Sequence, residues 1–210
     1  RALAGELLNL LDAAPQAVDY SADHGEMYSS REHHLRGVIG DHAGWLNVGR
    51  TRREAMRIAF RIVVRAQVLD LVEAACDLTT ALLDQSASNL DAVMPDYTYL
   101  QPAEPTTLGH YLGSFVDPLL RDAERLRREY PRVNASPMGA GAASGSALLW
   151  DRSIAGRDLG FEGPIDHVRD AMWQHDVVTH ALLAATTLVI GQDKLAEDLE
   201  ILTSREFSFV

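Results

Sequence analysis

The spacing of apolar residues predicts several long helices in this chain. Residues 51–93 contain neither glycine nor proline, and their apolar residues recur at steps of three and four positions, the spacing of one helix face. A second such stretch covers 166–190, and helical patterns also occupy 2–12, up to a break expected at Pro15, and 194–203, after Gly191. A segment over 106–130 contains Pro118, which must kink that helix or start a new one.

These patterns predict an all-α protein. A helix over 51–93 is far longer than the mean of about 11–12 residues, and such lengths are typical of helix bundles. No stretch shows a convincing strand pattern. We therefore expect an all-α long-helix bundle, with 1–47 as part of an N-terminal helical region and 48–210 as a central bundle domain. Because the first residue is Arg1 rather than Met, we expect the chain to be part of a longer protein.

A polar, proline-rich stretch separates two of the predicted helices. Residues 94–106 contain three prolines, which exclude a regular helix because each ring removes an N–H donor and restricts the preceding residue. Tyr97, Thr98, Tyr99 and Gln101 supply hydroxyl and amide groups that can bind a polar ligand. Such groups on a stiff loop between helices often carry function. A functional loop and a plain stiff connector remain equal alternatives at this point.

The long helix has an unusual start. Thr51 is a plausible N-cap with Glu54 three residues later, the spacing of a capping box. Arginines recur every four residues in the first half, and acidic residues occupy the second half, the reverse of what the helix dipole favours. An anionic ligand at the helix start, or the acidic end of an antiparallel partner helix in a two-fold contact, would compensate; a solvated basic face is the alternative. These arginines are Arg53, Arg57, Arg61 and Arg65.

Composition and charge exclude several classes of partner. The net charge of −11 argues against a general nucleic-acid surface, which needs clustered cations. No apolar run approaches the roughly 18 residues that a membrane helix requires, so no membrane partner is expected. The single cysteine, Cys76, lies in an apolar helical segment and is predicted to be buried. With no internal disulfide possible, a cytoplasmic location is expected.

Two other patterns suggest a metal site and a phosphate loop at first sight, but their spacing does not support either site. Four of the eight histidines lie between 19 and 44, but their spacing matches neither H-E-x-x-H nor the zinc patterns. We therefore expect a solvated surface there and no metal. The glycine-rich run 137–145 is not followed by the Gly-Lys-Ser/Thr of a phosphate loop, and no strand precedes it. Tight backbone packing between helices explains its small residues better.

Four segments, in this order and at these spacings, carry a resemblance to a known family. Gly49-Arg50-Thr51-Arg52-Arg53-Glu54 is similar to Gly-Arg-Ser-Arg-Asn-Asp, and residues 94–101 are similar to Met-Pro-Gly-Tyr-Thr-His-Leu-Gln. Residues 134–145 resemble Asn-x-x-Pro-Leu-Gly-x-Gly-Ala-x-Ala-Gly. Residues 195–199, together with 206–210, resemble the sequence that precedes the mobile catalytic loop of the same family. Over residues 44–210 the chain thus resembles the argininosuccinate lyase branch of the fumarase/aspartase superfamily.

This resemblance implies a fold and an activity. It implies a homotetramer with a core of long helices, in which each active site is built from three subunits. It further implies anti β-elimination from an N-substituted aspartate, a dicarboxylate, releasing fumarate and an amine without metal or organic cofactor. The family's serine base lies on the mobile loop that follows the segment ending at Val210, outside the given sequence.

The resemblance also assigns roles to residues. Arginines near a helix N-terminus suit the binding of carboxylates and of the charge that develops on one of them when the Cβ proton is removed. Thr98 and Tyr99 would then occupy catalytic positions, and Tyr28 the place of a histidine in the family's Asp-x-His, here Glu26-Met27-Tyr28. The substrate-binding residues implied are Arg50, Thr51, Arg52, Arg53, Gln101 and Tyr28.

Three substitutions separate this chain from the family pattern. Tyr99 and Tyr28 replace histidines, and Arg53 replaces an asparagine. Histidine exchanges a proton near neutral pH, whereas tyrosine does so only at high pH, so Tyr99 suits a hydrogen-bond donor to the leaving nitrogen better than a base. These changes indicate a different substrate or leaving group. A catalytically inactive, crystallin-like homologue is the alternative, although the retained Thr98, Gln101 and arginines favour a lyase.

Overall fold

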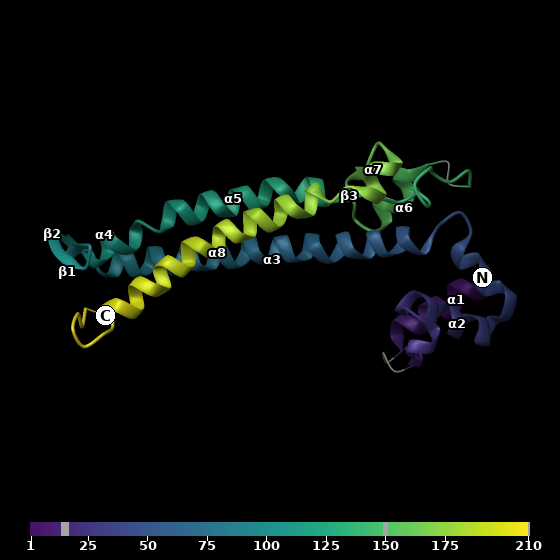
Figure 1. Ribbon diagram of the computed structural model, residues 1–210, viewed down its shortest axis with the longest axis horizontal. Helices are drawn as coiled ribbons and strands as arrows, with labels where there is room; N and C mark the ends of the chain where they lie inside the picture. Colours follow the sequence, from purple (N-terminus) through teal and green to yellow (C-terminus); the bar gives the residue numbers. More distant parts are fainter. Residues whose placement is uncertain (14–16, 149–150, 210) are drawn as a thin grey trace. The chain divides into compact units, whose positions relative to one another are not determined.

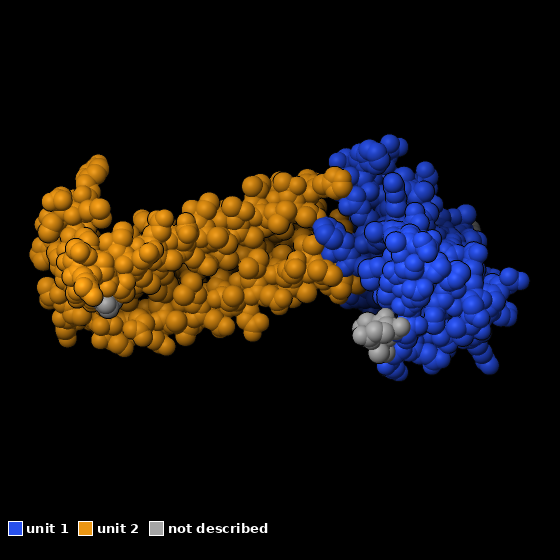
Figure 2. Space-filling model, turned by 60° about the horizontal axis from the view of Figure 1, so that its bottom comes forward, with its two compact units in different colours: residues 1–60, 136–174 blue, residues 61–135, 175–210 orange. Residues whose placement is uncertain are grey.

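The computed structural model describes residues 1–13, 17–148 and 151–209 of the 210-residue chain. It is a helical protein, so the predicted all-α class is confirmed. The chain forms two compact units, shown in Figure 2: unit 1 comprises residues 1–60 and 136–174, and unit 2 comprises 61–135 and 175–210. The predicted domain boundary after residue 47 stays a prediction. Among the described residues, no helix is both long and apolar enough to cross a membrane.

Unit 2 is built around the long helix that the sequence predicts. α3 (Arg52–Ser88) spans 37 residues and enters unit 2 at Arg61. α5 (Val116–Val133) and α8 (Asp176–Leu202) lie alongside it (Figure 1). Apolar side chains from all three helices form one core, because each helix turns one apolar face inward. The core includes Ala75, Leu82, Leu119, Leu126, Leu188 and Leu195.

Three of the predicted helical segments have other boundaries in the structure. The segment 106–130 divides into α4 (Leu108–Gly113) and α5. Pro118 lies in the first turn of α5, so of the two alternatives, a kink or a new helix, the new helix is correct. The segment 166–190 was wrongly taken as one helix, because α7 (Val168–Trp173) ends before α8 begins. The break expected at Gly191 was also wrong: α8 continues through it, since Leu188 and Leu195 are buried on either side.

The prediction of no strands was wrong for residues 93–107. β1 (Val93–Thr98) and β2 (Gln101–Thr107) form an antiparallel hairpin in which Thr98 pairs with Gln101 and the register shifts between Pro95 and Tyr97. A two-stranded sheet has only edge strands, where the missing N–H of proline is tolerated. The exclusion of helix by proline was therefore correct, while the strands escaped detection.

The arginine ladder has a partner that none of the three sequence-based alternatives included. The Arg61 guanidinium donates through one nitrogen to the carbonyls of Arg132, Val133 and Ala135, at 2.9, 3.2 and 3.3 Å. Arg65 donates to the Asn134 side chain at 2.9 Å. These acceptors lie at the C-terminal end of α5, where carbonyls lack helical partners and the helix dipole is negative. The end of α5 therefore compensates half of the ladder.

Cys76 is exposed, so its predicted burial was wrong. It shares a face of α3 with Leu69 and Leu83, each seven residues away and each 50% exposed. Seven residues are nearly two helical turns, so these side chains project on the same side. Apolar periodicity located the helix but could not distinguish the face buried within the chain from a second apolar face. α8 likewise exposes Leu182, Leu183, Val189 and Ile190.

Unit 1 contains short elements around the start of α3. α1 (Ala2–Asp12) confirms the first predicted helix, while the break expected at Pro15 lies outside the described residues. Between α1 and α3 lie η2, α2 and η3, and strand β3 pairs with β4 beside α6 and α7. The bounds are η2 Ala22–His24, α2 Met27–Ile39, η3 Gly40–Asn47, β3 Ala135–Ser136, α6 Arg152–Asp158 and β4 Gly163–Pro164.

Candidate active site

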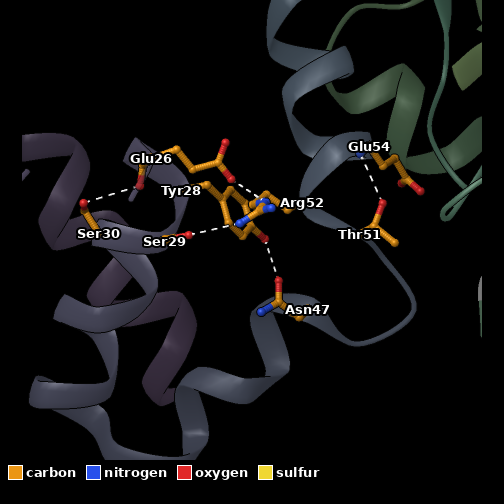
Figure 3. Close-up of polar contacts among 8 residues, drawn as sticks. All are labelled: Glu26, Tyr28, Ser29, Ser30, Asn47, Thr51, Arg52 and Glu54. Atoms are coloured by element: carbon orange, nitrogen blue, oxygen red, sulfur yellow. Dashed lines mark hydrogen bonds and ion pairs between the residues drawn. The ribbon is translucent and has the colours of Figure 1, made fainter. Parts of the chain in front are cut away.

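Arg52 is the first residue of α3, and its guanidinium binds a carboxylate. Its Nε forms an ion pair with Glu26, the residue that precedes α2, and its Nη1 donates to the Ser29 hydroxyl at 3.3 Å (Figure 3). The Arg52 side chain is 55% exposed and that of Glu26 is 35% exposed. An accessible guanidinium at the positive end of a long helix thus already binds a carboxylate of this chain.

Tyr28 lies on the first turn of α2, two positions after Glu26. Its hydroxyl donates to the Asn47 side-chain oxygen at 2.8 Å, which joins α2 to η3 (Figure 3). A tyrosine hydroxyl can still accept a further hydrogen bond while it donates one. The role of Tyr28 toward a substrate stays a prediction, but Asn47 is a partner that sequence reasoning missed.

Thr51 is the N-cap of α3, as predicted. Its Oγ1 accepts a hydrogen bond from the Glu54 N–H at 3.3 Å and donates one to the Gly141 carbonyl at 3.1 Å. The hydroxyl proton is therefore committed to Gly141, so Thr51 would have to release this carbonyl before donating to a substrate carboxylate. Its substrate-binding role stays a prediction.

The second half of the capping box is replaced by a longer-range contact. The Glu54 carboxylate accepts from the backbone N–H of Gly139 at 3.0 Å and of Gly141 at 2.6 Å, and the residue is only 1% exposed. Both glycines have positive φ, and a Cβ on Gly141 would lie 2.6 Å from the Gly145 carbonyl oxygen. The small residues of 137–145 thus form a backbone cradle for a carboxylate, rather than the predicted helix-to-helix packing.

The remaining arginines of this group differ in environment. Arg50 donates to the Leu46 carbonyl at 3.2 Å and lines a cavity of about 310 Å³ with Leu46 and Met138. Arg53 is exposed and makes no hydrogen bond or ion pair within the part of the chain that the structure describes. Arg53 is accordingly the cation here that is most open to a ligand. We call Arg50, Thr51, Arg52 and Arg53 the arginine group.

The other predicted residues lie at the turn of the β1–β2 hairpin. Thr98, Tyr99 and Gln101 are all exposed, and Tyr99 is 99% exposed. The Gln101 side-chain amide donates to the Leu100 carbonyl at 3.3 Å. We call these three residues the hairpin group. Within the part of the chain that the structure describes, their exposed hydroxyl and amide groups have almost no partners, so they are available to a molecule outside this chain.

The two groups belong to different compact units of the chain. The arginine group and Tyr28 belong to unit 1, and the hairpin group belongs to unit 2. Within unit 2, α3 runs from Arg61 to Ser88 before the hairpin begins, a distance of about 40 Å at 1.5 Å per residue. No group of three or more His, Cys, Asp or Glu side chains is placed to hold a metal ion among the residues described.

Sequence reasoning missed Glu26, Ser29 and the function of Glu54. Glu26 was visible as an acidic residue two positions before Tyr28, yet nothing in the sequence indicated that its partner would be Arg52, 26 positions later. The glycines at 139 and 141 were the available signal for Glu54, because two nearby glycines before a turn often present backbone N–H groups to an anion.

Comparison with known proteins gives one family. A family model described as "Lyase" matches residues 16–210. The argininosuccinate lyase of Natronomonas pharaonis is 36% identical over 199 residues, covering 94% of this chain and 41% of that protein. That of Ehrlichia chaffeensis is 31% identical over 192 residues, covering 91% and 41%. The chain therefore spans about two fifths of the length of these relatives.

Solved structures agree on the fold. A crystal structure of EDDS lyase in complex with formate superposes with a TM-score of 0.83 at 30% identity, covering 86% of this chain and 36% of that one. A structure of a fumarate lyase:delta crystallin from Brucella melitensis superposes with a TM-score of 0.72 at 18% identity, covering 88% and 44%. The second likeness supports the helical fold alone.

Proposed function

We propose that this chain, which belongs to the argininosuccinate lyase branch of the fumarase/aspartase superfamily, is part of a carbon–nitrogen lyase. The reaction proposed is anti β-elimination from an N-substituted aspartate, giving fumarate and an amine, with no cofactor. The observation that carries the proposal is the Arg52 guanidinium, accessible at the start of α3 and paired with a carboxylate. EDDS lyase and the argininosuccinate lyases among its relatives support the same bond type.

The chemistry gives each group a task. A base removes the Cβ proton, the electron pair forms the double bond of fumarate, and the C–N bond breaks with its electron pair leaving on nitrogen, which takes up a proton. Negative charge develops on the carboxylate next to Cβ, and preorganised cations and donors stabilise it. We assign that task to Arg52 and Arg53, with Arg50 and Thr51 supporting them.

The hairpin group completes the proposed site. Thr98 and Gln101 would donate hydrogen bonds to the substrate, and Tyr99 would donate to the leaving nitrogen. Tyr28 would line the site beside Glu26. The family's serine base lies on a mobile loop, and the chain spans about two fifths of the length of its relatives, so the catalyst is proposed to be the longer protein.

We further propose that the two groups meet between subunits of a homotetramer. Within one chain the arginine group belongs to unit 1 and the hairpin group to unit 2, and the part of α3 inside unit 2 covers about 40 Å before the hairpin begins. The apolar faces of α3 and α8, which include Leu69, Leu83 and Leu183, suit an interface between copies because large exposed apolar patches mark association sites. A stable monomer of the full-length protein in sedimentation would contradict this arrangement.

The direct test is the addition reaction. Full-length protein is mixed with fumarate and a panel of amines, and fumarate loss is followed by absorbance. Turnover with one amine identifies the leaving group. Arg52→Ala is expected to abolish fumarate binding while helix content is unchanged, whereas Arg36→Ala, an exposed arginine on α2 paired with Glu32, should bind normally. An unchanged fumarate affinity in Arg52→Ala would show that Arg52 is not part of the binding site.

A subunit-mixing experiment tests the shared site. Arg52→Ala and Thr98→Ala proteins, each inactive alone, are co-expressed and purified as mixed oligomers. If each site takes the two residues from different subunits, about one quarter of the sites in a randomly mixed closed oligomer are intact. No recovery of activity would contradict a site shared between subunits.

The alternative is a catalytically inactive, crystallin-like homologue. The substitutions Tyr99, Tyr28 and Arg53 favour it, because two of them remove a group that exchanges protons near neutral pH. Failure of turnover with every amine, together with normal assembly, is the result that would establish it.

A further inference from the structure

The turn between β1 and β2 holds two ordinary residues in an unfavourable backbone conformation. Tyr99 has φ of 52° and Leu100 has φ of 58°, and their neighbours Thr98 and Gln101 pair directly. A two-residue hairpin with positive φ at both positions is the type that favours Asn-Gly. A side chain with a Cβ is disfavoured there, so surrounding contacts must maintain the turn.

Tyr97 supplies such a contact on the inner side of the hairpin. Its ring lies edge-on to Phe207, with centroids 5.0 Å apart and planes at 71°, and 6.1 Å from Phe209. These two phenylalanines follow α8, and the Phe209 N–H donates to the Leu202 carbonyl at 3.0 Å, which returns the chain toward the hairpin. Tyr97 is half-buried, whereas the adjacent Thr98 is exposed.

The base of the hairpin is anchored separately. Met94 is only 5% exposed, and the Tyr111 hydroxyl on α4 donates to Asp198 on α8 at 2.6 Å. Between these anchors lies a cavity of about 100 Å³ whose lining includes Tyr97 and Leu100. The turn therefore does not rest on close packing along its whole length, and the aromatic contact of Tyr97, two residues before Tyr99, supports it.

We propose that Tyr97 is a positioning residue for the hairpin group, acting through its contact with Phe207. This inference rests on the proposed roles of Thr98 and Gln101. Adjacent residues of a strand point to opposite faces, so a fixed Tyr97 ring fixes the direction in which Thr98 projects. The strained turn is thereby formed before substrate binds, and less order has to be gained on binding.

The ring rather than the hydroxyl of Tyr97 carries this role. Within the described part of the chain, its hydroxyl makes no hydrogen bond, whereas the ring has two aromatic neighbours. Tyr97→Phe should accordingly match the parent protein, and Tyr97→Leu and Phe207→Leu should not. For the two leucine variants, we expect KM and the fumarate Kd to rise roughly tenfold to a hundredfold, the range for a displaced binding group. If Tyr97 were only structural, the leucine variants would have a lower Tm but an unchanged fumarate Kd at temperatures well below Tm.

Leu100→Gly tests the mechanism in the Tyr97→Leu background. Glycine adopts positive φ without strain, so the turn should form with less support and part of the fumarate affinity should return. A double variant that binds no better than Tyr97→Leu would overturn the role of Tyr97 in holding the turn.

Chymotrypsin provides a readout that does not need activity. It cleaves after aromatic residues in mobile segments, and Tyr99 is 99% exposed. Cleavage at Tyr99–Leu100 in full-length protein should accelerate in Tyr97→Leu and Phe207→Leu and stay at the parent rate in Tyr97→Phe. If no amine supports turnover, the proposed function fails while cleavage still tests Tyr97. Equal cleavage and equal fumarate Kd in all variants would overturn the inference.

Discussion

Glu54→Gln is expected to destabilise unit 1 by about 3 kcal/mol. The Glu54 carboxylate accepts two backbone hydrogen bonds, from Gly139 at 3.0 Å and Gly141 at 2.6 Å, and the residue is almost fully buried. Glutamine has one side-chain acceptor oxygen, and its NH₂ group would face the other N–H. The variant therefore loses a charge-assisted bond of about 1.5–3 kcal/mol and leaves a buried N–H unpaired at about 1–3 kcal/mol, partly relieved by relaxation.

The assay is equilibrium denaturation followed by tryptophan fluorescence, because Trp45 and Trp173 both belong to unit 1. Glu73→Gln is the matched control: it makes the same chemical change at an exposed position of α3 and should stay within about 0.5 kcal/mol of the parent. Glu54→Asp should fall between them, because its shorter side chain cannot reach both N–H groups at these distances.

A change below about 0.5 kcal/mol in Glu54→Gln, equal to that of the Glu73 control, would refute this reasoning. It would mean that the amide reorganises at no cost, or that the cradle does not depend on charge. Gly141→Ala should weaken the same region by a different route, because its Cβ would lie 2.6 Å from the Gly145 carbonyl oxygen at a backbone φ of +61°.

Three further outcomes are expected. Arg61→Ala should cost about 3 kcal/mol in thermal unfolding followed by circular dichroism, because it removes the donor shared by three carbonyls at the end of α5; a change within experimental error would refute the capping role. Hydrogen bonds from Arg127 and Arg128 lower the pKa of Glu124 from 4.5 to about 2. The NMR signal of its carboxyl carbon should therefore titrate near pH 2, and the titration should move toward pH 4.5 in Arg127→Ala. The stability that these ion pairs contribute is present above pH 4.5 and is lost as pH falls toward 2. Burial and the hydrogen bond to Asp198 raise the pKa of Tyr111, so Tyr111→Phe should not reduce tyrosinate absorbance at about pH 11, and the stability that this bond contributes should fall as pH rises above 10.

The helices were predictable because their signals are local. The absence of glycine and proline over 51–93 and the Thr51 cap define α3 to within a few residues. Pro118 indicated either a kink or a new helix, and it lies in the first turn of α5. The hairpin was not predictable, since three prolines obscure the alternation of a strand and Tyr99–Leu100 is not a turn pair that sequence rules recognise.

What could not be predicted depends on partners distant in sequence. The compensation of Arg61 comes from residues 71 to 74 positions later, at a helix end whose location the sequence leaves open. Glu54 fits a local capping box by spacing, yet its carboxylate binds residues 85 and 87 positions away. In both cases a charged group forms hydrogen bonds with backbone groups distant in sequence rather than with its nearest sequence neighbour, because buried backbone groups must be paired.

The same competition bears on how the proposed site could select a substrate. The chain carries a net charge of −11, so a dianion gains attraction only close to the arginine group. Arg52 is already paired with Glu26, and a substrate carboxylate at this position replaces one ion pair with another. Glu26 competes for Arg52 in the same way whichever dicarboxylate binds, so Arg52 is required for binding but distinguishes little among dicarboxylates. Discrimination among dicarboxylates must then come mainly from Arg53, which has no ion pair among the described residues, and from the direction of the donors on the hairpin, which Tyr97 is proposed to set.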